Sequence, residues 1–161
     1  MMALLLLFGA KIPSAIAQTD ATAVLKVVIT FFAEANAHNM GCGGLGESTS
    51  IDKGTASALF VEQPSVTDVV PPWHWEGKTA FKDWMADLAT YCTKHKDTPV
   101  KFTLAKPLSQ EVDGDHSNVV VPLVLDFKEE GKPVRAKGLA NVVLLKDHET
   151  WKILAFTFTQ Q

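Results

Sequence analysis

Residues 68–84, DVVPPWHWEGKTAFKDW, hold the chain's strongest candidates for acid–base chemistry within one short segment. Asp68 lies among valines, so we expect its carboxyl group to be partly buried. Burial raises the pKa of a carboxyl group, which suits a general acid or base. His74 follows six residues later, and imidazole titrates near neutral pH. We therefore predict Asp68 and His74 as the candidate catalytic residues.

Both residues also have a structural interpretation. Asp68 precedes two prolines and could instead accept backbone N–H groups at a rigid corner, or cap a neighbouring helix. If the segment around His74 is extended, its side chains alternate, so His74 faces away from Trp73 and Trp75. Either the tryptophans face a pocket and His74 faces solvent, or the reverse holds.

Aromatic side chains are the candidates for the wall of a pocket, because each offers a large apolar surface and some carry one polar group. Tyr91, the only tyrosine, either presents its hydroxyl group inward or packs as a ring with a wet hydroxyl. Asn141 alternates with Leu139 and Val143 and is a candidate polar group inside the pocket. The predicted ligand-binding residues are Phe31, Phe60, Trp73, Trp75, Trp84, Tyr91, Phe102 and Asn141.

Hydrophobic periodicity predicts the elements that position these residues. Helical spacing indicates helices over 21–38, 52–59 and 78–95, with a strand-like segment over 65–70. Four strands separated by turns then follow, over 100–104, 118–127, 134–145 and 151–159. Helices followed by antiparallel hairpins indicate an α+β fold. We expect a curved antiparallel sheet wrapped around the N-terminal helices as a half-open cone, whose end forms a pocket.

Two features concern the outer face of that sheet. If a turn is centred on residues 130–131, Asp126 and Arg135 lie opposite each other, and we expect this pair on the solvent face. The apolar stretch 119–125 could pair with a second copy of the chain, which makes a homodimer a further expectation.

Composition excludes several function classes. The net charge is −3 and no basic block is present, so we expect no nucleic-acid partner. The five histidines lack metal-ligand spacing, and no glycine-rich loop has the lysine and hydroxyl that would hold phosphates. We therefore expect no metal and no cofactor.

Residues 1–17 resemble a secretory signal peptide: an apolar run too short to span a bilayer precedes the small-residue triplet of residues 15–17. We expect a single mature domain over 18–161, secreted or periplasmic, that meets the membrane only through this signal. A buried N-terminal helix is the alternative. In an oxidising compartment, Cys42 and Cys92 either form a disulfide or remain free buried thiols.

The local sequence resembles the nuclear transport factor 2-like superfamily, including its SnoaL-like members and small exported bacterial proteins. The resemblance covers Ala21 to Gln160, and the loop from Met40 to Ser50 is longer than that pattern. The closing segment VRAKGLANVVLLKDHETWKILAFTFTQ also matches. The residues that match the central motif are Asp68, Pro71, Pro72, Trp75, Gly77, Ala80 and Trp84.

The resemblance implies a fold and a pocket, but the superfamily includes dehydratases, isomerases, cyclases, binding proteins and assembly domains. Our first hypothesis is an exported domain that binds a small hydrophobic or aromatic molecule. The alternative is a cofactor-free isomerase or dehydratase that uses Asp68, and a second alternative is a dimerising interaction module. A catalyst predicts a second titratable group beside Asp68, a binding protein predicts an apolar cavity with isolated polar groups, and an assembly module predicts a filled cavity.

Overall fold

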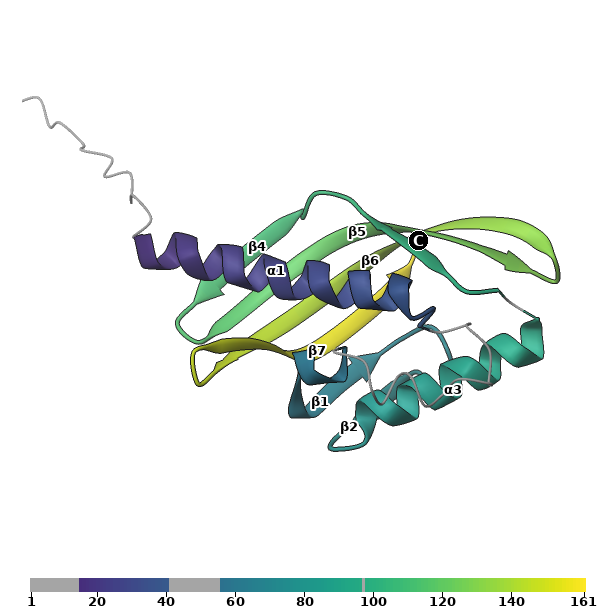
Figure 1. The fold of residues 1–161 in the computed structure, drawn as a ribbon, viewed down its shortest axis with the longest axis horizontal. Coiled ribbons are helices and arrows are strands. Elements are labelled where there is room, and N and C mark those ends of the chain that lie inside the picture. Colours follow the sequence, from purple (N-terminus) through teal and green to yellow (C-terminus); the bar gives the residue numbers. More distant parts are fainter. Residues whose placement is uncertain (1–14, 41–55, 97) are drawn as a thin grey trace, which may run out of the picture.

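The computed structural model describes residues 15–40, 56–96 and 98–161. They form two helices, one turn of 3-10 helix and a seven-stranded curved sheet that does not close on itself (Figure 1). The helices are α1 (Ala15–Ala37) and α3 (Ala80–His95), and the 3-10 turn is η1 (Ser57–Leu59). The strands are β1 (Phe60–Thr67), β2 (His74–Glu76), β3 (Lys101–Leu104), β4 (Ser109–Asp113), β5 (His116–Glu129), β6 (Lys132–Asp147) and β7 (Thr150–Gln160). This arrangement confirms the predicted α+β cone.

The strand order is β2-β1-β7-β6-β5-β3, and β4 also pairs with β5. All pairs are antiparallel except β1 with β7, which run parallel, so the sheet is mixed where we predicted a purely antiparallel one. β1 covers 60–67 rather than the predicted 65–70 and ends just before Asp68. Two short strands, β2 and β4, add to the four that the periodicity predicted.

Helix α1 lies across one face of the sheet (Figure 1). Its buried side chains recur at helical spacing, as predicted, so one continuous stripe faces the strands. The helix begins six residues before the predicted start at residue 21. Of the predicted helix over 52–59, residues 52–55 lie outside the described residues and Ser57–Leu59 form the 3-10 turn. The stripe consists of Val24, Val28, Phe31, Phe32 and Ala35.

Polar contacts fix α1 to the sheet near both of its ends. Near the C-terminal end, the Asn36 side chain accepts the Phe102 N–H at 2.8 Å and donates to the Phe102 carbonyl at 2.9 Å. Near the N-terminal end, Asp20 Oδ1 lies 3.1 Å from Lys146 Nζ and accepts the indole N–H of Trp151 at 3.2 Å. We call Asp20, Lys146 and Trp151 the Asp20 clamp.

The Asp20 clamp has a definite electrostatic character. The hydrogen bond from Lys146, followed by that from Trp151, lowers the pKa of the Asp20 carboxyl group. The same contact with Asp20 raises the pKa of the Lys146 ammonium group. Both groups are therefore held in their charged forms, which suits a structural ion pair.

Strand β6 leaves space for the aromatic rings of β7. A Cβ atom added at Gly138 would lie 2.9 Å from the Thr159 carbonyl and closer still to the Phe158 ring. Ala140, two residues on, pairs with Phe158. The missing side chain at Gly138 therefore leaves the space that the Phe158 ring occupies.

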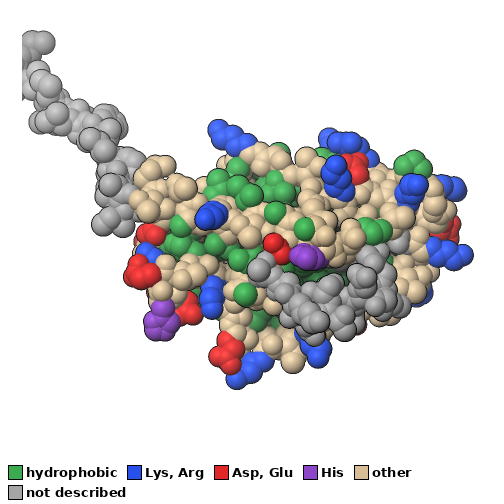
Figure 2. Space-filling model, viewed as in Figure 1, with side chains coloured by type: hydrophobic (Ala, Val, Ile, Leu, Met, Phe, Trp, Pro, Cys, Tyr) green, Lys and Arg blue, Asp and Glu red, His purple; other side chains and the backbone are tan. Residues whose placement is uncertain are grey.

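The surface shows no large area of one charge on the face drawn in Figure 2, where acidic and basic side chains are interspersed. On the outer face, Asp126 pairs with Arg135 as predicted, with an N···O distance of 3.3 Å. Within the described part of the chain, neither helix is long and apolar enough to cross a membrane.

Candidate functional site

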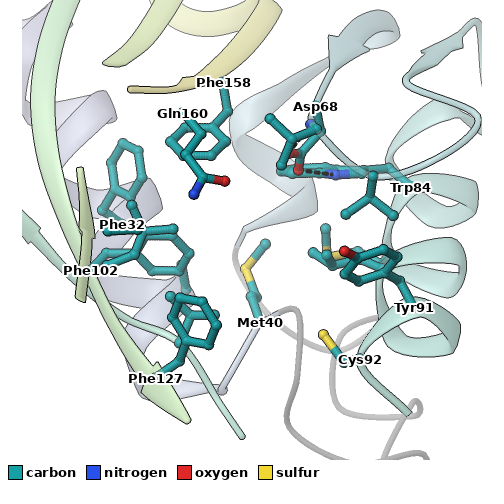
Figure 3. Close-up of a pocket in the computed structure, with 18 of the residues that line it drawn as sticks. Phe32, Met40, Asp68, Trp84, Tyr91, Cys92, Phe102, Phe127, Phe158 and Gln160 are labelled. Atoms are coloured by element: carbon teal, nitrogen blue, oxygen red, sulfur yellow. Dashed lines mark hydrogen bonds between the residues drawn. The ribbon is translucent and has the colours of Figure 1, made fainter. Parts of the chain in front are cut away.

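A cavity of about 250 Å³ opens between α1, α3 and the inner face of the sheet (Figure 3). Aromatic rings from both helices and from three strands make most of its wall. Figure 3 shows Asp68, Trp84 and Tyr91 on one side, with Phe32, Phe102 and Phe127 across from them. The aromatic residues that line the cavity are Phe31, Phe32, Trp84, Tyr91, Phe102, Phe127, Phe156 and Phe158.

The carboxyl group of Asp68 is the buried polar group in this wall. Asp68 is 9% exposed and lies between the end of β1 and helix α3. Its Oδ1 accepts the Val69 N–H at 2.6 Å, and its Oδ2 accepts the indole N–H of Trp84 at 2.8 Å. Its own backbone N–H donates to the Trp73 carbonyl, which closes the corner after β1. Asp68 thus accepts a backbone N–H at the corner, as its structural interpretation predicted, and it also lines the cavity.

Burial raises the pKa of the Asp68 carboxyl group above its ordinary value. The hydrogen bonds from Trp84 and Val69 act in the opposite direction but are the weaker effects. Among the described residues, no lysine, arginine or histidine forms an ion pair with this carboxyl group. Asp68 therefore carries its proton at a higher pH than a solvated aspartate does.

Three further polar side chains reach the cavity. The Tyr91 hydroxyl group and the Gln160 amide turn toward its interior (Figure 3). Glu129, which is exposed, lies at the rim. The ring of Tyr91 stacks on that of His95, with centroids 4.2 Å apart, and this contact orients the tyrosine. The cavity thus has an apolar wall with a few separated polar groups.

The structure places His74 outside the cavity. It is exposed at the start of β2, where its Nδ1 lies 3.2 Å from the Thr67 hydroxyl oxygen and its Nε2 lies 3.9 Å from Glu76. Thr67 and His74 are partners in the β1–β2 pairing, which sets both on the outer side of the strand pair. Asp68 and His74 do not share a site.

The two tryptophans on either side of His74 lie in different environments. Trp75 is buried on the inner side of β2, as alternation with His74 allows, but it lies behind the cavity and donates its indole N–H to Asp87 at 2.8 Å. Trp73 is 59% exposed because it precedes β2 and has a left-handed φ of 71°, so strand alternation does not apply to it. Neither ring lines the cavity.

Two more predicted ligand-binding residues lie elsewhere. Phe60 is buried in the core, where its ring contacts Phe31 and Phe81 at centroid distances of 5.6 and 4.9 Å. Asn141 is exposed on the outer face of β6, because it pairs with Val120 and alternates with the inward-facing Ala140. Four of the eight predicted ligand-binding residues line the cavity: Phe31, Trp84, Tyr91 and Phe102.

Several wall residues escaped the sequence interpretation. Gln160 and Glu129 continue the inward-facing alternation of Phe158 and Phe127, so period-two reasoning extended to the strand ends would have found them. Met40, after the end of α1, gave no such signal. Phe32 follows Phe31 in the buried stripe and could have been assigned to the wall with it.

The chemistry available in the cavity is narrow. Among the described residues, no three His, Cys, Asp or Glu side chains group as metal ligands would. Cys92 lines the cavity and is disulfide-bonded, while Cys42 lies outside the described residues. The other polar side chains that the described wall offers are one buried carboxyl group, one carboxyl group at the rim, one phenol and one amide.

No protein-family model and no curated protein matches the chain. Its fold does match solved structures. A candidate dehydratase of the nuclear transport factor 2-like family from Streptomyces avermitilis is 16% identical, and the match covers 89% of this chain and 97% of that protein with a TM-score of 0.63.

Two other solved structures extend the range of functions that share this fold. A ketosteroid isomerase-like protein from Erwinia carotovora atroseptica is 10% identical, over 88% of this chain and 95% of that one, with a TM-score of 0.61. The CaMKII hub of S. rosetta is 16% identical, over 93% and 100% respectively, with a TM-score of 0.60. At such identities the likeness concerns the fold and leaves the function to be argued from the site.

Proposed function

Because the chain has the nuclear transport factor 2-like fold, we propose that it is an exported domain that binds a compact hydrophobic or aromatic small molecule. The observation that carries this proposal is the cavity of about 250 Å³ with eight aromatic residues in its wall. Small-molecule pockets are mostly apolar and have a few polar groups that orient the ligand. Their usual volume is about 300–1,000 Å³, so this cavity suits a ligand near the small end.

The energetics favour binding by burial. Each 100 Å² of apolar ligand surface removed from water contributes roughly 2.5 kcal/mol, before the costs of immobilising the ligand are subtracted. The Asp68 carboxyl group, the Tyr91 hydroxyl group and the Gln160 amide would then fix the orientation of one polar substituent. Aromatic wall and separated polar groups together are what a binding protein needs.

Two features support export. Residues 1–17 have the pattern of a cleaved signal, and Cys92 is disulfide-bonded, as is common for proteins of oxidising compartments. We propose that the mature chain begins at Gln18. Helix α1 would then keep its buried stripe and the Asp20 clamp.

The binding proposal is tested by filling the cavity. The protein is secreted by an expression host, and the intact mass of the secreted protein checks that it begins at Gln18. It is then titrated with small aromatic compounds such as indole and benzyl alcohol, and binding is followed by saturation-transfer NMR. Ala136 lines the cavity, so Ala136→Phe should abolish binding. Ala155 pairs with Val143 on the opposite face of the sheet, so Ala155→Phe is the matched control and should bind as the wild type does. Binding that survives in Ala136→Phe contradicts the proposal.

A second candidate is a cofactor-free isomerase or dehydratase. The observation that favours it is the raised pKa of a buried carboxyl group in a cavity, a common property of acid–base catalysts. We rank it second because the side-chain partner of Asp68 is the indole of Trp84, which cannot take up a proton in catalysis.

Proton exchange separates this candidate from simple binding. A general base would exchange the α-protons of a bound cyclic ketone with D₂O, followed by NMR, and Asp68→Asn would reduce the rate by about 100-fold or more. A wild-type rate no higher than that of Asp68→Asn would exclude the catalytic role.

A dimerising module has less support from the fold, since that hypothesis required a filled interior. The stretch 119–125 also divides between two faces. Val119, Val121 and Leu123 belong to the buried core, which leaves Val120, Pro122 and Val124 half-buried on the outer face.

A further inference from the structure

We propose that the cavity selects a small organic cation, a protonated amine on an aromatic or aliphatic group, over neutral or anionic molecules of the same size. This inference rests on the proposed function, binding of a compact apolar molecule, and adds the charge of the ligand. Three independent observations carry it: the sign of the charges in the wall, the lack of a counter-charge for Asp68, and the aromatic faces around it.

The charged residues of the wall are all acidic. Asp68 is buried in it and Glu129 lies at the rim, while no lysine, arginine or histidine of residues 15–40, 56–96 and 98–161 lines the cavity. An anionic ligand would face this carboxyl group without any balancing positive charge. The low dielectric of a buried site strengthens both this repulsion and the matching attraction for a cation.

Asp68 has no counter-charge in the part of the chain that the structure describes, although its burial calls for one. Both of its oxygens are held by neutral donors, the Val69 N–H and the Trp84 indole. A buried carboxylate is costly to keep ionised unless it is paired with a positive charge. The Asp20 clamp supplies such a partner from within the protein, Lys146, whereas the described residues of the cavity wall supply none. An ammonium group on the ligand would complete the same kind of pair with Asp68.

The aromatic wall is suited to the rest of such a ligand. The face of an aromatic ring carries partial negative charge and attracts a cation, tryptophan most strongly. Trp84 donates to Asp68 and is itself held by aromatic neighbours, with Phe156 at 5.3 Å and Phe31 at 6.4 Å between centroids. Phe102 and Phe127 lie across the cavity from it (Figure 3). A cation beside Asp68 would therefore meet aromatic rings on both sides.

The test compares three probes that differ mainly in charge: 2-phenylethylamine, 2-phenylethanol and phenylacetate. Calorimetry near neutral pH should show that the wild type binds the amine roughly tenfold more tightly than the alcohol, with the carboxylate weakest. Asp68→Asn should bring the amine-to-alcohol ratio of affinities close to one. Asp87→Asn is the control, because Asp87 accepts an indole N–H from Trp75 outside the cavity.

The outcomes separate this inference from the proposed function. Alcohol binding equal to or tighter than amine binding in the wild type overturns the inference and leaves the binding function standing. No binding of any probe overturns both. A tenfold preference that persists in Asp68→Asn overturns the assignment to Asp68.

Wild-type protein provides a test that does not depend on the folding of any variant. As the pH falls from about 8 to about 4, the amine stays charged while the protonated fraction of Asp68 rises, so the amine-to-alcohol ratio should fall. The other titratable groups in the wall are Tyr91 on α3 and Glu129 on β5, and Glu129→Gln removes the contribution of the rim carboxyl group. A ratio that stays flat over this range overturns the inference.

Discussion

Two aspartate–tryptophan hydrogen bonds lie at different places in this fold, and their carboxyl groups behave in opposite ways. At the cavity, the Trp84 indole donates to Asp68 at 2.8 Å, and the pKa of Asp68 is raised by burial. At the N-terminal end of α1, the Trp151 indole donates to Asp20 at 3.2 Å, and the pKa of Asp20 is lowered. The indole hydrogen bond is common to both, so it cannot be the cause of the difference.

The difference lies in burial, which is the main cause of the raised pKa of Asp68, and in one cation beside Asp20. Lys146 lies 3.1 Å from Asp20, whereas Asp68 has no ion-pair partner among the described residues. A complete pair fixes a helix to a sheet and leaves no unsatisfied charge. A buried carboxyl group without an ion-pair partner favours either its protonated form or the binding of a cation from outside the protein. The same two side-chain types thus make a structural contact in one place and a receptive site in the other.

The largest expected effect comes from removing each indole N–H while keeping a ring. Trp84→Phe leaves the buried Asp68 with a single donor and should lower the free energy of unfolding by about 1–3 kcal/mol beyond the loss of ring contacts. Trp151→Phe should cost less, because Asp20 keeps Lys146. Urea denaturation followed by circular dichroism measures both, and the two tryptophans are equally buried, each 4% exposed.

Trp75→Phe gives a third reference, since Trp75 donates to the half-buried Asp87. Its loss should fall between the other two. Equal losses in Trp84→Phe and Trp151→Phe would mean that the cation at Asp20 contributes nothing, and the contrast between the two sites would collapse.

A smaller effect distinguishes the two aspartates more directly: they should change the free energy of unfolding with pH in opposite directions. Unfolded aspartate titrates near its ordinary pKa of 3.8. Because the pKa of Asp68 is raised in the folded state, the unfolded chain gives up the Asp68 proton at a lower pH than the folded chain does. The free energy of unfolding therefore falls as the pH rises from 3.8 to the folded pKa of Asp68. The lowered pKa of Asp20 has the reverse effect, and its stabilisation is lost as pH falls below 3.8.

Denaturation over a series of pH values should resolve the two signatures. The stability of Asp68→Asn relative to the wild type should increase as pH rises above about 4, by at most about 1.4 kcal/mol per pH unit. The advantage of the wild type over Lys146→Met should shrink as pH falls below about 4. Any constant cost of either substitution cancels in these slopes. With both differences taken as variant minus wild type, the slope should be positive for Asp68→Asn and negative for Lys146→Met, and slopes of the same sign would contradict the electrostatic contrast.

Sequence patterns predicted the helices and strands better than they predicted which strands lie side by side in the sheet. Helical spacing identified the buried stripes of α1 and α3, and the turn after β5 set Asp126 opposite Arg135. The parallel pairing of β1 with β7 left no trace, because alternation tells which face a side chain occupies and not which strand lies beside it. The early end of β1 was missed because valines on both sides of Asp68 imitate a continuing strand.

The site was predicted only in part, because periodicity gives the face of a side chain and not its neighbours. Asp68 was expected to be partly buried, and it is, but its partner Trp84 lies sixteen residues away across a change from strand to helix. Alternation grouped Trp73 with Trp75 on the side opposite to His74, and alternation fails at a residue with left-handed backbone geometry. Local periodicity thus predicts which residues turn inward, while the meeting of two particular side chains depends on how the elements pack.

The parallel pairing of β1 with β7 has a consequence for how the chain is made. Val66 pairs with Phe156, about ninety positions later, so a nascent chain can form the β1–β2 hairpin long before the other edge of β1 finds its strand. Until β7 has left the ribosome, that edge offers free backbone groups to any other extended chain. One edge of β1 therefore stays unpaired, and open to pairing with other chains, until β7 has been made.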